Sequence, residues 1–482
     1  MSKQIGRPGK TAQPPGSCPL GGKREVFGRL LAATLVGVVF VAACSSASDD
    51  AAAPAIPAVT ATPPTTDGAD PADEPLPTST ASTSASIAAP TGLRVGAAVL
   101  AADGFAELTG QRIGVILNQA STIDGQPLLD VLARTEGIDL VAAFGPEHGV
   151  RGTAAAGAPV TGGIDATTGV RIHSLYGDTR APTPAMLAEL DVLVFDLQDV
   201  GARVYTYLAT MGLAMQSAAE AGLPFIVLDR PNPLGGSYVD GHVRDEDHAS
   251  FIGQYPVPAA HGMTAGELAL AIKGEGWLPG LDGLDLRVVE MSGWHRDDRW
   301  ADLGLGWAPP SPSLPSPTAA EVYPGTVLFE ATSLSVGRGT AEPFTTIGAP
   351  WVDGPALAGA LNELGLAGVS FEAVTFVPEA TESVPAPPYA GETSHGVRVV
   401  IEDASFRPVA TGLHLLVAFR DHADARGEPE LVAAPKLFDL LTGTDAVRTA
   451  LEAGASATQL IEAWSPEVAA FEELRRRYLL YD

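Results

Sequence analysis

The sequence predicts a doubly wound, Rossmann-like α/β domain followed by a smaller α+β domain. In the first half of the folded region, short runs rich in Val, Ile, Leu and Phe alternate with segments of helical spacing. This alternation is typical of buried parallel strands joined by crossover helices. In the second half, strand-like runs and helices follow a proline-rich stretch, and we assign them to the α+β domain.

The elements of the first half can be placed in order along the chain. Strands are expected at residues 112–117, 140–144, 191–195 and 224–228, and helices at 127–136, 184–189 and 205–221. Thr183 is the expected N-cap of the middle helix. No G-x-G-x-x-G follows the first strand and no phosphate loop is present, so the fold class does not imply a nucleotide and we expect no cofactor.

The second half begins near residue 296, just before the proline-rich run Pro309–Pro315. Strands are expected at residues 327–329, 374–377 and 397–401, and helices at 355–364, 408–419 and 457–477. The predicted domains are therefore 91–295 and 296–482.

The N-terminal residues 1–44 resemble a bacterial lipoprotein signal peptide. Lys23, Arg24 and Arg29 precede an uncharged stretch, residues 30–43, which is shorter than the roughly 20 residues that a membrane-spanning helix needs. The stretch ends in Val-Ala-Ala-Cys, which resembles a lipobox with Cys44 as the lipidated residue. A plain secretory signal with an incidental cysteine is the less favoured alternative. We expect the mature protein to be extracytoplasmic and attached to the cell membrane only by the lipid anchor.

Residues 45–90 consist almost entirely of Ala, Pro, Ser, Thr, Asp and Gly and predict a disordered tether. The chain carries 29 Lys and Arg against 57 Asp and Glu, a net charge of −28, of which −27 falls after residue 90. Nucleic acid is therefore excluded as an expected partner. Both cysteines, Cys18 and Cys44, precede the tether, so catalysis in the folded region must use other side chains.

Polar residues follow each of the four expected strands of the first half. They are Asn118-Gln119, Pro146-Glu147-His148-Gly149, Asp196-Leu197-Gln198-Asp199 and Asp229-Arg230-Pro231-Asn232. The carboxyl ends of parallel strands meet at one edge of a sheet, where ligands bind. Each motif alone is more simply a turn or a helix cap, but the four together favour an active cleft.

Several long motifs, in the same order along the chain, resemble the NamZ-type exo-β-N-acetylmuramidases, a glycoside hydrolase family. They are residues 144–152 (FGPEHGVRG), 174–177 (SLYG), 191–207 (DVLVFDLQDVGARVYTY), 228–236 (LDRPNPLGG), 261–264 (HGMT), 323–326 (YPGT) and 335–340 (SVGRGT). The resemblance implies a Rossmann-like domain and a smaller domain with the active site between them. It also implies release of N-acetylmuramic acid from the non-reducing end of peptidoglycan fragments.

Glycoside hydrolysis usually needs an acid that protonates the leaving oxygen and a second group that attacks or activates water. Glu147 is the expected acid, and His148 orients it or contacts sugar hydroxyls. A helix-capping or packing role is the alternative for His148. Asp196 is favoured as the second catalytic group over Asp199, Asp229 and Glu330. The acetamido oxygen of the substrate is a further alternative nucleophile.

The lactyl carboxylate of muramic acid requires local positive charge in an acidic domain, and arginine suits it best. A structural ion pair is the alternative role for each candidate arginine. The expected substrate-binding residues are Asn118, Arg151, Tyr176, Gln198, Asp199, Asp229, Arg230, Asn232 and Arg338, and no metal ligand is expected.

Two other functions remain open from the residues alone. One is a metal-dependent hydrolase that uses Glu147, His148, Asp196 and Asp229, although the closely spaced histidines of familiar zinc motifs are missing. The other is a non-catalytic wall-binding lipoprotein, which would have no need of Glu147. The chain also departs from the family pattern: Ala158 stands where an acidic residue is expected, and Ser394-His395 stands where Cys-Gly is expected.

Overall fold

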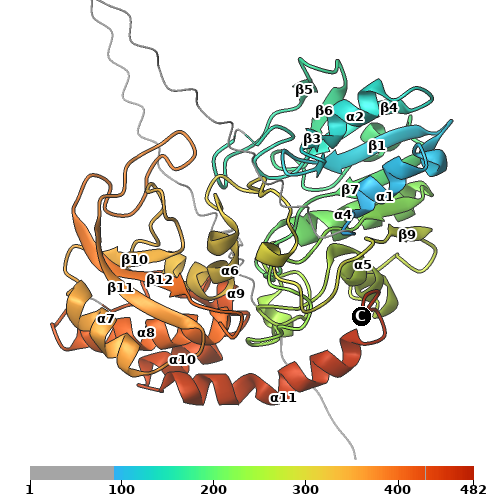
Figure 1. Ribbon diagram of the computed structural model, residues 1–482. Helices are drawn as coiled ribbons and strands as arrows, with labels where there is room; N and C mark the ends of the chain where they lie inside the picture. The colour runs from blue at the N-terminus through green and yellow to red at the C-terminus, as the bar shows by residue number, and fades with distance from the viewer. Residues whose placement is uncertain (1–91, 153, 429) are drawn as a thin grey trace, which may run out of the picture. The chain divides into compact units, whose positions relative to one another are not determined.

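The larger domain is built on a seven-stranded sheet of order β5-β6-β4-β1-β7-β8-β9 (Figure 1). The computed structural model describes residues 92–152, 154–428 and 430–482, so the predicted signal peptide, Cys44 and the tether lie outside the described residues. The strands are β1 (Arg112–Leu117), β4 (Asp139–Gly145), β5 (Gly163–Ile164), β6 (Arg171–Ser174), β7 (Val192–Asp196), β8 (Phe225–Leu228) and β9 (Leu286–Val289). All neighbours pair in parallel except the short edge strand β5. The doubly wound fold class is confirmed.

The four strands expected in this domain are β1, β4, β7 and β8, and the three expected helices are α2 (Leu128–Arg134), α3 (Pro184–Leu187) and α4 (Tyr207–Ala221). Two further helices, α1 (Gly96–Ala102) and α5 (Ala265–Gly274), and a small hairpin of β2 (Thr122–Ile123) and β3 (Gln126–Pro127) complete the domain, together with the short helices η1 (Ala106–Leu108), η2 (Glu246–His248) and η3 (Trp300–Asp302). Helix α4 ends at Gly222, whose left-handed φ of +69° suits glycine.

Both faces of the large sheet are buried, because successive side chains of a strand point to opposite faces. In β7, Val192 and Val194 belong to one hydrophobic cluster, whereas Leu193 and Phe195 belong to another. Helices cover both faces, which explains why the strands read as continuous apolar runs.

The smaller domain contains an antiparallel sheet of order β10-β12-β11, so the predicted α+β class is also confirmed. Its strands are β10 (Thr346–Ala349), β11 (Val369–Phe376) and β12 (Ser394–Ile401). Its helices are α6 (Pro317–Thr326), α7 (Gly354–Glu363), α8 (Pro408–Asp424), α9 (Pro435–Thr442), α10 (Ala446–Glu452) and α11 (Ala457–Arg475).

The strand expected at residues 327–329 is wrong. These residues belong to η4 (Val327–Ala331), a 3₁₀ helix that continues directly from α6. Val327 has helical dihedral angles (φ −59°, ψ −25°), and every residue of the segment except Glu330 is buried in the core. A buried apolar run of three residues has no periodicity that separates a strand from a helical turn.

The end of the chain returns to the larger domain after α11 (Figure 1). The Tyr481 hydroxyl donates to Asp229 at 2.7 Å, Arg475 donates to the carbonyl of Gly236 at 2.7 Å, and the amide of Arg296 donates to the carbonyl of Asp482 at 3.0 Å. The last residues of the chain therefore help to complete the first domain.

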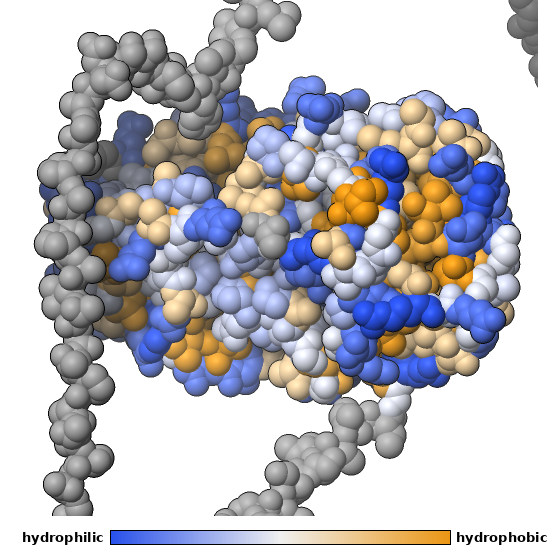
Figure 2. Space-filling model, turned by 90° about the horizontal axis from the view of Figure 1, so that it is seen from above, coloured by the Kyte–Doolittle hydropathy of each residue, from blue (hydrophilic) through white to orange (hydrophobic). Residues whose placement is uncertain are grey.

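On the face seen in Figure 2, hydrophobic residues form small patches separated by hydrophilic ones. Within the described residues, we find no helix with the length and hydropathy required to span a membrane.

Candidate active site

Glu147 lies in the tight loop that follows β4, and its carboxylate is held from two sides. The amide of Gly157 donates to Oε1 at 2.8 Å, and the hydroxyl of Thr206 donates to Oε2 at 2.9 Å. Thr206 directly precedes α4, so the helix start and the loop together fix the position of the carboxylate. The side chain remains half-buried and borders a pocket.

His148 has an unusual backbone conformation and a buried side chain. Its φ of +70° is strained for a residue with a Cβ atom. Nδ1 lies 2.9 Å from the carbonyl oxygen of Ala154. Because a carbonyl oxygen can only accept a hydrogen bond, Nδ1 carries the proton, and Nε2 of the neutral ring is an acceptor. Burial lowers the pKa of His148, which favours the neutral imidazole.

The pocket beside Glu147 has a volume of about 190 Å³ and receives residues from both domains. Those from the larger domain are Glu147, His148, Ala156, Tyr176, Val204, Tyr205, Thr206, Tyr207 and Ile252. The lining residues that come after the large sheet in the chain are Ser311, Leu314, Tyr323, Val327, Glu330, Arg338, Phe344, Leu437 and Leu441.

Aromatic rings form much of the pocket wall. Tyr205 packs edge-on against Tyr207 at 4.8 Å and against Tyr323 at 6.0 Å, and Tyr323 packs edge-on against Phe344 at 4.8 Å. Burial raises the pKa of Tyr205 and of Tyr323, so both hydroxyls stay protonated. Burial, reinforced by the Glu147 carboxylate, raises the pKa of Tyr176 to about 12. The wall therefore offers apolar ring faces and neutral hydroxyls.

Arg338 projects into the pocket from a loop between two glycines with positive φ, Gly337 and Gly339. Its Nε donates to Oε1 of Glu330 at 2.5 Å, and Nη1 donates to Ser313 at 2.7 Å. Burial lowers the pKa of Arg338, but the neighbouring Glu330 carboxylate raises it, so the pKa stays above its ordinary value. Nη2 makes no hydrogen bond to a described residue, so a donor remains for a ligand.

The structure thus brings together four of the residues expected from the sequence, namely Glu147, His148, Tyr176 and Arg338. Glu330, which the sequence offered only as an alternative second carboxylate, lies with them. Thr206 was not expected, although it lies in the family-like motif at residues 191–207.

Asp196 and Arg230 pair with each other outside this pocket lining. Nε and Nη2 of Arg230 lie 2.5 and 2.9 Å from the two oxygens of Asp196, and Nη2 also donates to the carbonyl of Thr122 at 3.1 Å. Asp196 is fully buried, so its carboxylate is already satisfied and does not face Glu147 across the pocket.

The other expected residues also lie outside the pocket lining. Asp229 accepts from Thr264 at 2.7 Å, Asp199 accepts from the amide of Gly201 at 2.7 Å, and Gln198 donates to the carbonyl of Pro231 at 2.7 Å. Asn232 donates to the carbonyl of Met263 at 3.1 Å, and Arg151 bonds to Asp165 and Asp130. In each case the side chain forms hydrogen bonds within the fold around the pocket.

Asn118 helps to fix the proline-rich segment against the pocket. Its amide donates to the hydroxyl of Tyr207 at 2.8 Å, and that hydroxyl donates to the carbonyl of Pro310 at 2.6 Å. Gln119 donates to the carbonyl of Pro309 at 2.8 Å. The segment therefore forms a wall held by the carboxyl end of β1.

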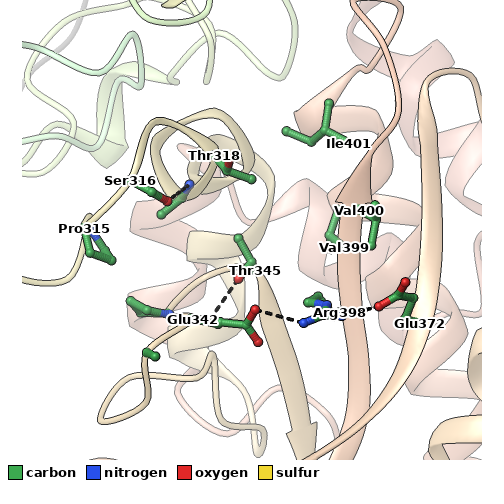
Figure 3. Close-up of a pocket in the computed structure, with 13 residues that line it drawn as sticks. Pro315, Ser316, Thr318, Glu342, Thr345, Glu372, Arg398, Val399, Val400 and Ile401 are labelled. Carbon is green, nitrogen blue, oxygen red and sulfur yellow. Dashed lines mark hydrogen bonds and ion pairs between the residues drawn. The ribbon is translucent and has the colours of Figure 1, made fainter. Parts of the chain in front are cut away.

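A separate pocket lies over the sheet of the smaller domain (Figure 3) and has a volume of about 550 Å³. Its charged residues pair among themselves, because Arg398 bridges Glu342 and Glu372. Within the described part of the chain, no group of three or more His, Cys, Asp or Glu residues is arranged to hold a metal ion.

The fold and the site define a class: a two-domain α/β enzyme whose pocket combines two carboxylates, an arginine and aromatic walls, as in a glycoside hydrolase. Residues 113–318 match the family model described as exo-beta-N-acetylmuramidase NamZ, N-terminal, and residues 321–481 match its C-terminal counterpart. The chain therefore belongs to the NamZ family. The two family models meet between residues 318 and 321. The domain boundary at 295/296 stays a prediction.

Similar proteins agree with this assignment. The chain is 42% identical over 377 residues to the peptidoglycan beta-N-acetylmuramidase NamZ of Bacillus subtilis (strain 168), which covers 78% of this chain and 88% of that protein. Crystal structures of two DUF1343 family proteins from Bacteroides fragilis NCTC 9343 match with TM-scores of 0.74 and 0.66, at 36% and 34% identity. Each match covers 81% of this chain and 99% of the other.

Proposed function

We propose that this protein is an exo-β-N-acetylmuramidase that releases N-acetylmuramic acid from the non-reducing end of peptidoglycan fragments. The observation that carries the proposal is a pocket of about 190 Å³ with Glu147 at its wall and a free arginine donor within it. A pocket of this size accommodates a single sugar, which suits removal of one terminal residue at a time. The family membership of the chain and the name of its Bacillus subtilis relative support the same activity.

Glu147 acts as the acid in this proposal. The amide of Gly157 can only donate, so Oε1 of Glu147 must remain an acceptor, and the transferable proton resides on Oε2. The Thr206 hydroxyl beside Oε2 can donate or accept, so it fits both the protonated and the ionised carboxyl. A positioned acid of this kind protonates the leaving oxygen as the glycosidic bond breaks.

The second catalytic group is assigned to Glu330 in place of Asp196. Glu330 lines the same pocket as Glu147, whereas the Asp196 carboxylate is paired with Arg230. Only one Glu330 oxygen is hydrogen-bonded to Arg338 among the described residues, which leaves the other for the anomeric side of the sugar. Glu330 serves either as nucleophile or base, or as the group that steers the acetamido oxygen of the substrate.

Arg338 receives the lactyl carboxylate that distinguishes muramic acid from glucosamine. Its free Nη2 supplies a charge-assisted hydrogen bond and places a positive charge inside the pocket of a region whose net charge is −27. The aromatic wall supplies faces for the apolar side of the sugar ring.

The test is Glu147→Gln, which keeps the size of the side chain but removes the proton. We expect kcat on a chromogenic muramide to fall by about 10²–10⁴-fold, while the affinity for N-acetylmuramic acid, measured by calorimetry, changes little. Undiminished turnover would remove Glu147 from the acid role.

Glu342→Gln is the matched control for this test. Glu342 pairs with Arg398 in the pocket of Figure 3, outside the catalytic pocket. Turnover by the wild type in the presence of EDTA separates this mechanism from the metal-dependent alternative. Loss of turnover in EDTA, restored by added metal, would favour that alternative.

We also propose that the protein is a lipoprotein anchored through Cys44 to the outer side of the cell membrane. The lipobox-like Val-Ala-Ala-Cys and the tether composition support it. Labelled palmitate should be incorporated into the wild-type chain and not into Cys44→Ser, with both followed in the membrane fraction. Equal labelling of the two chains would contradict the anchor.

A further inference from the structure

A pocket of about 650 Å³ lies at the carboxyl ends of β1, β7 and β8, apart from the catalytic pocket. From these ends come Ala120, Gln198 and Arg230. The chain runs from β1 outward to β4 and β6, and then crosses to β7, β8 and β9 on the other side. The order reverses between β1 and β7, and open α/β sheets bind ligands at such a switch point.

Two tryptophans also line this pocket. Trp300 and Trp307 pack edge-on at 4.7 Å, and both contribute to the lining. Trp300 is buried and Trp307 is half-buried. The Nε1 donor of Trp300 has no hydrogen-bond partner among the described residues. We call this site the tryptophan pocket.

The polar groups of the tryptophan pocket suit a neutral ligand. The charge of Arg230 is already balanced by Asp196, and Nη1 of Arg230 makes no hydrogen bond to a described residue. Arg230 therefore acts as a hydrogen-bond donor. The other two charged lining residues, Arg94 and Asp124, carry one charge of each sign and add a donor and an acceptor. Aromatic faces beside fixed polar groups match the alternation of C–H faces and hydroxyl edges on a sugar.

One stretch of chain connects the tryptophan pocket with the catalytic pocket. Residues 304–308 line the former, and Ser311 and Leu314 line the latter. Pro309 and Pro310 between them are held by Gln119 and Tyr207. Three peptide units span at most about 11 Å, so Ala308 and Ser311 are separated by no more than a short oligosaccharide can bridge.

We propose that the tryptophan pocket binds N-acetylglucosamine-containing sugars on the leaving-group side of the scissile bond. This inference rests on the proposed function, because a catalytic pocket for one sugar leaves the rest of the glycan to be held elsewhere. The pocket of Figure 3 is less suitable, since no aromatic side chain lines it and its charges pair with one another.

The kinetic test compares a chromogenic muramide with a tetrasaccharide that has muramic acid at its non-reducing end. For Trp307→Ala, the ratio of kcat/KM for the tetrasaccharide to kcat/KM for the muramide should fall by about tenfold, through KM. Trp307→Phe keeps a ring but loses the hydrogen bond from Nε1 to the carbonyl of Leu314. This variant should retain most of the ratio. An unchanged ratio in Trp307→Ala, or an equal fall in both variants, would overturn the proposal.

A binding test does not depend on turnover. Chitotetraose, which lacks muramic acid, should bind Glu147→Gln in a calorimetric titration, and Trp307→Ala in that background should weaken binding by about tenfold. Absence of chitotetraose binding would overturn the tryptophan pocket as a sugar site. Absence of muramide turnover by the wild type would instead overturn the proposed function, so the two failures are distinguishable.

Discussion

At the scale of single residues, the catalytic pocket depends on which side chains are left incompletely bonded. Arg338 contacts the Glu330 carboxylate through one nitrogen, Nε, whereas Arg230 forms a two-point contact with Asp196 that balances its charge. In the sequence the two look alike, because each is an arginine within a family-like motif of an acidic chain. Each was therefore an expected substrate-binding residue. Only their partners in space separate the arginine that can receive an anion from the one whose charge is already balanced.

Arg338→Lys tests this distinction. Lysine keeps the charge but carries its donors on one nitrogen, so it does not reproduce the separate contacts of the guanidinium to Glu330, Ser313 and a ligand carboxylate. The preference for a chromogenic muramide over the matching glucosaminide, measured as a ratio of kcat/KM, should fall by about 10–100-fold. Arg398→Lys is the matched control, because Arg398 pairs with Glu342 and Glu372 outside the pocket. An unaltered ratio in Arg338→Lys would contradict the lactyl-binding role.

The sequence places Glu147, His148, Tyr176 and Arg338 in one site through motifs, and the structure brings all four to one pocket. The sequence alone could not separate these four residues from Asp196, Asp199, Asp229 and Asn232. The strand-end rule selects an edge of the sheet, and all these residues lie near that edge. The strand-end rule does not tell which side chains form hydrogen bonds within the fold and which face the cavity.

At the scale of helices and strands, hydrophobic runs predict the sheet well where the strand is central. Strands β1, β7 and β8 lie inside the sheet and are almost wholly buried. The edge strand β9 is only partly buried and was not expected, because an arginine interrupts its short apolar run. Helix α6 also departs from simple sequence rules, since Pro324 lies inside it.

Helix α6 carries a half-buried carboxylate that should make stability depend on pH. Burial raises the pKa of Glu321 to about 7, with Asp302 adding to the shift and Arg299 opposing it. The unfolded chain releases this proton near pH 4.5, so wild-type stability falls as pH rises from about 4.5 to about 7. Above that range the loss is constant.

Glu321→Gln removes this loss and should therefore be more stable than wild type at pH 8, by about 1–3 kcal/mol. The two chains should converge near pH 4.5. Chemical unfolding at both pH values measures the difference, and Glu363→Gln, at the exposed end of α7, reports the effect of neutralising a surface carboxylate. A constant difference across the pH range would contradict the assignment.

At the scale of the whole molecule, the chain order differs from the packing order. The smaller domain was predicted as residues 296–482, yet the final residues contact the larger domain. The amide of Leu480 donates to Glu267 at 2.8 Å, and Arg296 also bonds to Glu267. Composition and periodicity describe local segments, so they contain no signal for this return.

Tyr481 provides a test of the return, because its hydroxyl serves two buried groups. It donates to Oδ2 of Asp229 at 2.7 Å and accepts from the amide of Met291 at 3.0 Å. Asp229 is fully buried, and burial raises its pKa, so each donor that stabilises the carboxylate matters. Tyr481→Phe keeps the ring packed edge-on against Trp294 but removes the hydroxyl. We expect the free energy of unfolding to fall by about 2–3 kcal/mol.

The matched control is Tyr478→Phe, three residues earlier in the chain, whose hydroxyl bonds to Glu275. Thr264 and Gly266 still donate to Asp229 in either variant, so neither change should unfold the protein. If the C-terminal residues only rest on the larger domain, Tyr481→Phe and Tyr478→Phe will lose equally little stability in urea unfolding. If the last residues complete the core beneath the catalytic sheet, Tyr481→Phe will lose clearly more. The single hydroxyl of Tyr481 then links the end of the chain to the strand β8 that precedes Asp229.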